Sequence, residues 1–204
     1  MIEARDLSLA YGGRTVLDRV SIAIRPGQLT VLAGPNGAGK SSLLKALSGE
    51  VEPAAGAAFL DGRDLRQFQP ARLSRRRAVL PQSSQLAFPF TVAEIVRLGL
   101  EAGGHRQRPE AVRSALARVG LAGFGGRSYG ELSGGEQSRV HLARVLAQAG
   151  APVEAGEPRY LFLDEPVSSL DIRHQVEVLA IARDFALGGG GVVAVLHDLN
   201  LASG

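Results

Sequence analysis

A glycine-rich stretch between a predicted strand and a predicted helix constrains the fold more than any other part of the chain. The stretch is GPNGAGKSS at residues 34–42, which follows the apolar run LTVLAG at 29–34 and leads into SSLLKALSG at 41–49. Glycines in such a loop let consecutive backbone N–H groups converge on an anion, and the dipole of the following helix adds to the attraction. The sequence therefore predicts a phosphate-binding loop at the carboxyl edge of a parallel sheet.

Several residues of this loop are candidate ligands. Lys40 would reach the outer phosphates with a slim ammonium group, and the Ser41 hydroxyl would coordinate Mg²⁺. The other loop residues expected to line the phosphates are Gly34, Pro35, Asn36, Gly37, Ala38, Gly39 and Ser42. The alternative is a glycine-rich turn without a ligand, and the strand–loop–helix context argues against it.

A second candidate group ends the apolar run YLFLDE at residues 160–165. A buried strand that ends in Asp164 would place this carboxylate at the carboxyl edge of the sheet, where it would hold Mg²⁺ through water. Glu165 follows directly and is expected to orient or deprotonate an attacking water. An acidic pair that caps a helix is the alternative. Together with the phosphate-binding loop, the pair favours phosphoryl-transfer chemistry.

The rest of the chain alternates between predicted strands and predicted helices. Residues 1–11 and 15–24 alternate apolar and polar side chains around a Gly-Gly turn, which predicts a β-hairpin. Further strands are expected at 57–62, 78–82, 160–165 and 191–198, helices at 91–100, 110–121, 132–147 and 171–187, and a loop at 151–158. Strands that alternate with helices indicate an α/β fold around a parallel sheet.

The 204 residues are expected to form a single domain with two parts. Residues from about 1–89 and 151–204 would form a core with an N-terminal antiparallel β subdomain, and about 90–150 an inserted α-helical subdomain. Thr91 and Glu94 have the spacing of a capping box, which predicts the start of the first helix in that insertion.

Composition excludes several classes of protein. The chain has no cysteine, which excludes disulfides and thiolate metal sites. No apolar run approaches the about 18 residues of a membrane helix, and the N-terminal residues lack a signal-peptide pattern. The net charge is +3, and the basic run RLSRRR at 72–77 is expected to be a solvated face. No aromatic residues are interleaved with these arginines, which argues against nucleic acid as a partner.

The stretch LSGGEQ at 132–137 begins a predicted helix. Its first backbone N–H groups are close-packed and lack helical partners, so this helix start is a second candidate anion-binding site. With the loop at 34–42 and the acidic strand at 160–165, it resembles one family over essentially the whole chain, the ATP-binding cassette (ABC) ATPases. The resemblance implies a P-loop NTPase, RecA-like core that binds ATP and Mg²⁺ and hydrolyses ATP.

The resemblance also implies roles for residues outside these motifs. Gln82 matches the glutamine that senses Mg²⁺ and the attacking water and contacts the transporter, and His197 matches the switch histidine at the γ-phosphate. Tyr11 falls where the family stacks an aromatic ring on adenine. Residues 168–171 match the loop that crosses the dimer interface.

In that family two cassettes pack head to tail, and each ATP lies between the phosphate loop of one chain and the signature helix of the other. The resemblance therefore implies a homodimer, in which the residues directed to the partner's ATP or the interface are Ser133, Gly134, Gly135, Glu136 and Asp171. It also implies permease subunits as membrane partners and a periplasmic substrate-binding protein as an indirect one. The chain would then lie at the cytoplasmic face of the inner membrane.

The segment FPFTVAEIVRLG at 88–99 resembles importers of iron–siderophore, heme and cobalamin, and PVSSLDIRHQVEVLAIAR at 166–183 looks most like the hemin-importer ATPases. The hypotheses that stay open are a siderophore or cobalamin importer ATPase and a soluble, non-transport ABC ATPase. In the family the chain usually continues past the switch histidine, whereas this sequence stops at HDLNLASG. The C-terminal end is therefore expected to be truncated.

Overall fold

The computed structural model describes residues 1–82, 89–106, 108–166 and 171–196 of the chain. The strands are β1 (Ile2–Tyr11), β2 (Arg14–Ile24), β3 (Leu29–Ala33), β4 (Ala55–Leu60), β5 (Arg63–Asp64), β6 (Arg77–Leu80), β7 (Val153–Glu154), β8 (Glu157–Pro158), β9 (Tyr160–Asp164) and β10 (Gly191–Leu196). The helices are α1 (Lys40–Ser48), α2 (Pro70–Arg76), α3 (Val92–Ala102), α4 (Pro109–Arg118), α5 (Gly134–Ala149) and α6 (Ile172–Leu187). Short 3₁₀ turns lie at Leu65–Gln67, Phe124–Gly126 and Tyr129–Glu131.

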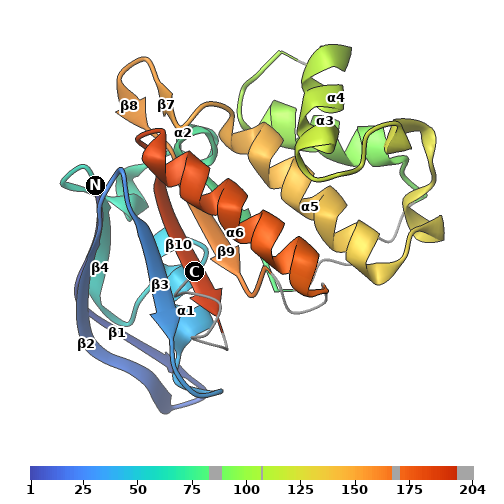
Figure 1. The fold of residues 1–204 in the computed structure, drawn as a ribbon. Coiled ribbons are helices and arrows are strands. Elements are labelled where there is room, and N and C mark those ends of the chain that lie inside the picture. Colours follow the sequence, from blue (N-terminus) through green and yellow to red (C-terminus); the bar gives the residue numbers. More distant parts are fainter. Residues whose placement is uncertain (83–88, 107, 167–170, 197–204) are drawn as a thin grey trace.

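An antiparallel sheet with the strand order β2-β1-β4-β5 contains the N-terminal part of the chain (Figure 1). The predicted hairpin is confirmed, because β1 pairs with β2 and Tyr11 faces Arg14 across the turn. The strand predicted at 57–62 is β4, which also pairs with β1 in the antiparallel sense.

A parallel sheet with the order β3-β10-β9-β6 forms the centre of the molecule (Figure 1). Every neighbouring pair in it is parallel, which confirms the predicted α/β fold. All residues of β9 and β10 are buried, as expected for central strands that are covered on both faces.

Alternate side chains of β9 enter two different hydrophobic cores, because successive side chains of a strand point to opposite faces. Tyr160 and Phe162 pack with residues of α1 and the antiparallel sheet. Leu161 and Leu163 pack in a second core with residues of α3, α4, α5 and α6. The parallel sheet is therefore the middle layer, and the predicted helices of residues 90–150 share a continuous core with one of its faces.

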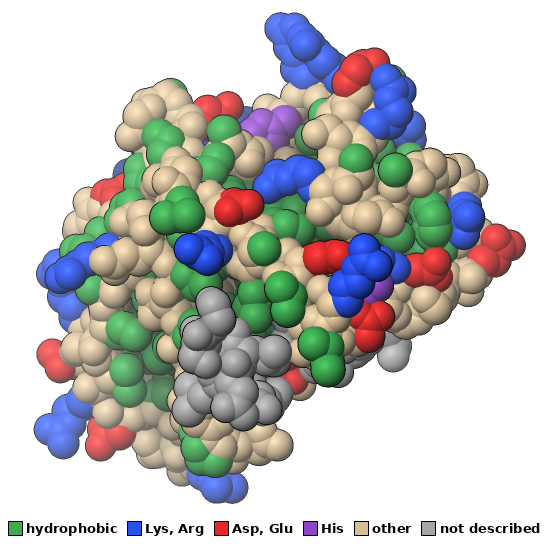
Figure 2. Space-filling view, in the orientation of Figure 1, with side chains coloured by type: hydrophobic (Ala, Val, Ile, Leu, Met, Phe, Trp, Pro, Cys, Tyr) green, Lys and Arg blue, Asp and Glu red, His purple; other side chains and the backbone are tan. Residues whose placement is uncertain are grey.

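The outer face of α6 carries more apolar surface than a solvated helix usually does. Val178, Ala182, Phe185 and Ala186 are buried toward the sheet. Ile172, Val176 and Leu187 are exposed, and Figure 2 shows hydrophobic side chains along the visible face of this helix. Among the residues described, no helix is long and apolar enough to span a bilayer.

The expectation that RLSRRR forms a solvated face is wrong for its last two arginines. The run lies in α2 except for Arg77, which begins β6, and Arg76 is only 5% exposed. Its Nη2 atom is 2.6 Å from Asp61 Oδ2, and its Nη1 atom is 3.2 Å from Glu157 Oε2. Arg77 Nε donates to the Ser48 carbonyl oxygen at 2.6 Å, and burial lowers the pKa of the Arg77 guanidinium. Two arginines of the run therefore join elements inside the molecule.

The prediction of a loop at 151–158 is wrong, because this segment contains a short antiparallel hairpin formed by β7 and β8. Val153 pairs with Pro158 and Glu154 with Glu157. Ala155 and Gly156 form the turn, both with positive φ. The hairpin lies beside α2 in Figure 1, at the end of the sheet where β9 begins.

Candidate functional site

The glycine-rich loop lies between β3 and α1, as predicted, and its shape depends on Gly39. This residue is the N-cap of α1 in a left-handed conformation with φ of 85°. A Cβ atom on Gly39 would lie 2.8 Å from Leu17 Cδ2 and 3.0 Å from the Val16 carbonyl oxygen. The loop can therefore pack against β2 only with glycine here.

Lys40 is folded back over the loop. Its Nζ atom donates to the carbonyl oxygens of Gly34 at 2.8 Å and Pro35 at 2.9 Å. An ammonium group is a compact charge with three donors, so this position lets Lys40 exchange carbonyl partners for phosphate oxygens with a small movement.

Ser41 and Asp164 are brought together from positions 123 residues apart. The Ser41 hydroxyl donates to Asp164 Oδ1 at 2.8 Å, and Asp164 is 2% exposed at the carboxyl end of β9. A hydroxyl and a carboxylate at the foot of a phosphate-binding loop are the hard oxygen donors that Mg²⁺ takes together with phosphate oxygens and waters. The donor set therefore fits magnesium.

Gln82 and Glu165 also lie next to each other, although 83 residues separate them in the sequence. Gln82 Nε2 donates to Glu165 Oε2 at 2.8 Å. Glu165 follows β9 directly and has a φ of 51°, a left-handed conformation that is uncommon for a residue other than glycine. The backbone thus turns sharply after Asp164.

These residues surround an open cleft of about 650 Å³, which is within the usual size range of a ligand site. Its lining includes the loop residues Asn36 to Ser42 together with Gln82 and Glu165. Arg14, Thr15 and Val16 also line it, and sequence reasoning missed them because nothing in their pattern marks the start of β2 as part of a site. Tyr11 is 48% exposed on the neighbouring strand end and pairs with Arg14, next to the cleft.

The signature residues begin α5 on a different part of the molecule. Ser133 is the N-cap of α5, and its Oγ atom accepts a hydrogen bond from the Glu136 backbone N–H at 3.4 Å. Glu136 Oε2 accepts from the Ser133 backbone N–H at 2.8 Å, which completes a capping box. The hydrogen bonds from Ser133 lower the pKa of the Glu136 carboxyl. Glu136 therefore stabilises the conformation of the signature, and Ser133 and Gly134 are exposed to solvent.

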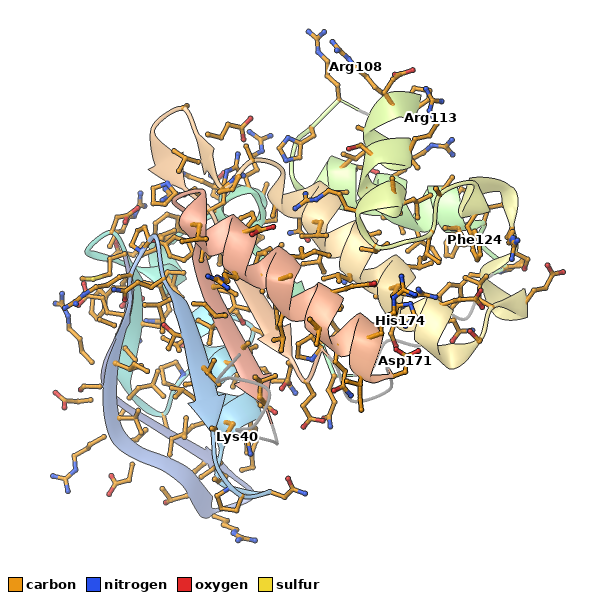
Figure 3. The ribbon with its side chains drawn as sticks, in the orientation of Figure 1. Lys40, Arg108, Arg113, Phe124, Asp171 and His174 are labelled. Carbon is orange, nitrogen blue, oxygen red and sulfur yellow. The ribbon has the colours of Figure 1, made fainter. Side chains whose placement is uncertain are left out.

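Asp171 lies beside the signature helix rather than in the cleft. It caps α6, and its Oδ1 atom accepts from His174 N at 3.0 Å and contacts His174 Nδ1 at 2.8 Å. His174 Nε2 in turn contacts Arg139 of α5. Figure 3 shows Asp171 and His174 at the end of α6 next to α5, well separated from Lys40. His197 and residues 168–170 lie outside the described residues.

The profile of the ABC transporter family matches residues 17–168, which is most of the chain and spans the cleft and the signature helix. The chain belongs to the ABC transporter family. Among solved structures, it superimposes on an ATP-binding subunit of an ABC transporter with a TM-score of 0.85, at 27% identity over 99% of this chain and 81% of the other. A dimeric bacterial ABC transporter cassette gives a TM-score of 0.84, at 26% identity over 99% of this chain and 90% of the other.

Two curated ABC proteins are more similar in sequence. A protein of Rhizobium meliloti (strain 1021) named "Hemin import ATP-binding protein HmuV" is 57% identical over all of this chain and 78% of its own length. The protein of the same name in Agrobacterium fabrum (strain C58 / ATCC 33970) is 58% identical, with the same shares covered. The ABC chain described here is thus an ATPase cassette of the transporter family.

Proposed function

We propose that this chain is the ATP-hydrolysing subunit of an importer for hemin. One observation carries the proposal: the loop, Gln82 and Glu165 line one cleft, with Asp164 hydrogen-bonded to Ser41 of that loop, in a cassette that is 57% identical to a hemin import ATP-binding protein. An importer of siderophores or cobalamin and a soluble ABC ATPase are the alternatives. The similarity to hemin-import proteins over the whole chain favours hemin among them.

The residues of the cleft have distinct proposed tasks. Lys40 would bind the outer phosphates, and Ser41 and Asp164 would hold Mg²⁺, which would offset negative charge on the phosphate oxygens. Gln82 orients the Glu165 carboxylate through the Nε2–Oε2 hydrogen bond of 2.8 Å. Glu165 then takes a proton from the attacking water. Tyr11 would stack on adenine and His197 would contact the γ-phosphate.

A second copy of the chain would complete each site. Ser133, Gly134 and Gly135 stand at the start of α5, which lies away from the cleft of its own chain (Figure 1). The Ser133 hydroxyl and the backbone N–H groups of Gly134 and Gly135 are therefore expected to bind the phosphates held by a partner. The part from about 90–150 would carry this signature, and the parts from about 1–89 and 151–204 would carry the cleft. Asp171, beside α5, would lie at the interface.

The cassette is proposed to act on transmembrane permease subunits at the cytoplasmic face of the membrane. A periplasmic substrate-binding protein would supply hemin to the permease and would not touch the cassette. ATP can drive closure of the pair only through contacts that exist in the closed state and are absent from the open one.

Growth on hemin tests the cargo. A Rhizobium meliloti strain without its own HmuV would receive this chain, and hemin would be the only iron source. We expect growth with the unchanged chain and none with Glu165→Gln at equal protein level, because the variant keeps the cleft and loses the base. Parallel strains that lack their own cobalamin-import or ferric-siderophore-import ATPase would also receive this chain, and uptake of the corresponding cargo would be measured. Rescue of one of these without rescue on hemin would contradict the hemin assignment.

A further inference from the structure

A second pocket, of about 400 Å³, lies at the opposite end of the parallel sheet from the nucleotide cleft. Four arginines and one glutamate line it: Arg72, Arg75 and Arg76 from α2, Arg159 at the start of β9, and Glu157 from β8. Figure 1 shows α2 and the β7–β8 hairpin together at this end, while Lys40 in Figure 3 is at the other. None of the roles assigned above uses these residues.

Arg159 is buried in the wall of this pocket, as Arg76 is, with 7% of its surface exposed. It forms a salt bridge with Glu154 through Nη2. Within the described part of the chain, its Nε and Nη1 atoms are buried and have no hydrogen-bond partner. Burial lowers the pKa of the Arg159 guanidinium, and the nearby charges of Arg76 and Arg75 lower it further. A buried cation with unused donors beside other cations is costly unless an anion compensates it.

The charges around the pocket do not balance. Arg76 pairs with Asp61 and Glu157, Asp61 pairs with the N-terminal ammonium, and Arg159 pairs with Glu154. Five positive groups, counting Arg72, Arg75 and that ammonium, thus face three carboxylates, an excess of 5 − 3 = +2. A phosphate dianion would neutralise this excess, and its oxygens match the planar donor fork of arginine.

We propose that this arginine pocket binds a phosphate-bearing anion. Arg72 and Arg75, with exposed side chains, would make the direct contacts, and Arg159 would supply positive charge from the wall. The phosphate belongs either to a soluble phosphate compound or to the headgroup of a phospholipid. The strand β9 connects this pocket to Asp164 at the nucleotide cleft.

The test must separate this pocket from the nucleotide loop, which also binds phosphate. All proteins would therefore carry Lys40→Ala, and pyrophosphate would be titrated into them by calorimetry. The test variant adds Arg72→Gln and Arg75→Gln. The control adds Arg108→Gln and Arg113→Gln, which removes the same charge from exposed arginines of α4 and the residue before it (Figure 3). Arg159→Gln is less suitable, because it leaves Glu154 without its partner.

We expect pyrophosphate to bind the Lys40→Ala protein and the control, and to bind the test variant about tenfold more weakly or not at all. Circular dichroism would verify that both variants fold. An absence of binding to the Lys40→Ala protein, or an equal loss in the control, would overturn the proposal. Sedimentation with phosphatidylcholine vesicles, with and without phosphatidic acid, distinguishes the sources. Capture by phosphatidic acid that needs Arg72 and Arg75 supports a headgroup, and pyrophosphate binding alone supports a soluble phosphate.

Discussion

Glu165 combines a proposed catalytic carboxylate with a backbone conformation that suits glycine better. Its φ of 51° places it in the left-handed region, which costs about 1–2 kcal/mol for a residue with a Cβ atom. Its carboxylate accepts a hydrogen bond from Gln82 at 2.8 Å. The fold therefore holds a strained residue at the point where the reaction needs a base.

Two substitutions separate the strain from the chemistry. Glu165→Gly and Glu165→Ala both remove the carboxylate, and only glycine relieves the backbone. We expect both variants to lose ATP hydrolysis, and the glycine variant to exceed the alanine variant in free energy of unfolding by about 1 kcal/mol. Urea denaturation measures this difference. Equal stabilities would show that the left-handed backbone stores no strain.

Asp61 makes stability depend on pH through its pairing with the N-terminal ammonium and with Arg76. Burial by itself raises the pKa of the Asp61 carboxyl, but the N-terminal ammonium and Arg76 outweigh it and hold the pKa below its ordinary value. The stabilisation is therefore complete above about pH 4 and is lost as the pH falls through the lowered pKa. We expect Asp61→Asn to destabilise the protein at pH 7 and to have a smaller effect at pH 3. Asp18→Asn, at an exposed pair with Arg19, is the control and should have little effect at either pH.

At the scale of elements, α3 and α5 both begin with a capping box. Thr91 and Glu94 form a capping box on α3, and Ser133 and Glu136 form one on α5. We expect Thr91→Ala and Ser133→Ala each to lower the free energy of unfolding by about 1 kcal/mol, because each leaves helical N–H groups without a partner. Only Ser133→Ala should also reduce ATP hydrolysis. A similar loss of hydrolysis in Thr91→Ala would mean that the cap and not the signature is responsible.

Elements with a regular local pattern could be predicted from the sequence. The start of α3 follows from Thr91 and Glu94, and the turn between β1 and β2 from Gly12 and Gly13. The loop before α1 and the acidic end of β9 are local motifs, so Ser41 and Asp164 could be assigned to one site before their contact was known.

Elements whose partners are distant in sequence could not be predicted. The buried residues of α2 are Leu73 and Arg76. Because one of the two is an arginine, the sequence lacks the regular spacing of apolar residues that predicts an amphipathic helix. The carboxylate partners of this arginine, Asp61 and Glu157, lie on other elements. The strands β7 and β8 have two residues each, too few to show an alternating pattern.

At the scale of the whole molecule, the cleft and the signature lie apart, so two copies are expected to share their sites. We expect a mixture of two inactive variants, Lys40→Ala and Ser133→Arg, to hydrolyse ATP. In a mixed pair the intact loop of one chain meets the intact signature of the other, which restores about a quarter of all sites after random pairing. A phosphate-release assay on each variant and on the mixture measures this. No recovery in a mixture that forms mixed pairs would contradict sharing.

The position of β9 between β10 and β6 also has a consequence for hydrogen–deuterium exchange. Its amides bond within a sheet whose central strands are buried on both faces, so they can exchange only when the whole domain opens. We expect the amides of β9 and β10 to be among the last to acquire deuterium, and those at the exposed start of α5 to acquire it much earlier. The carboxylate of Asp164 would thus be fixed to the part of the protein that exchanges last, and the signature to a helix start whose first residues are exposed to solvent.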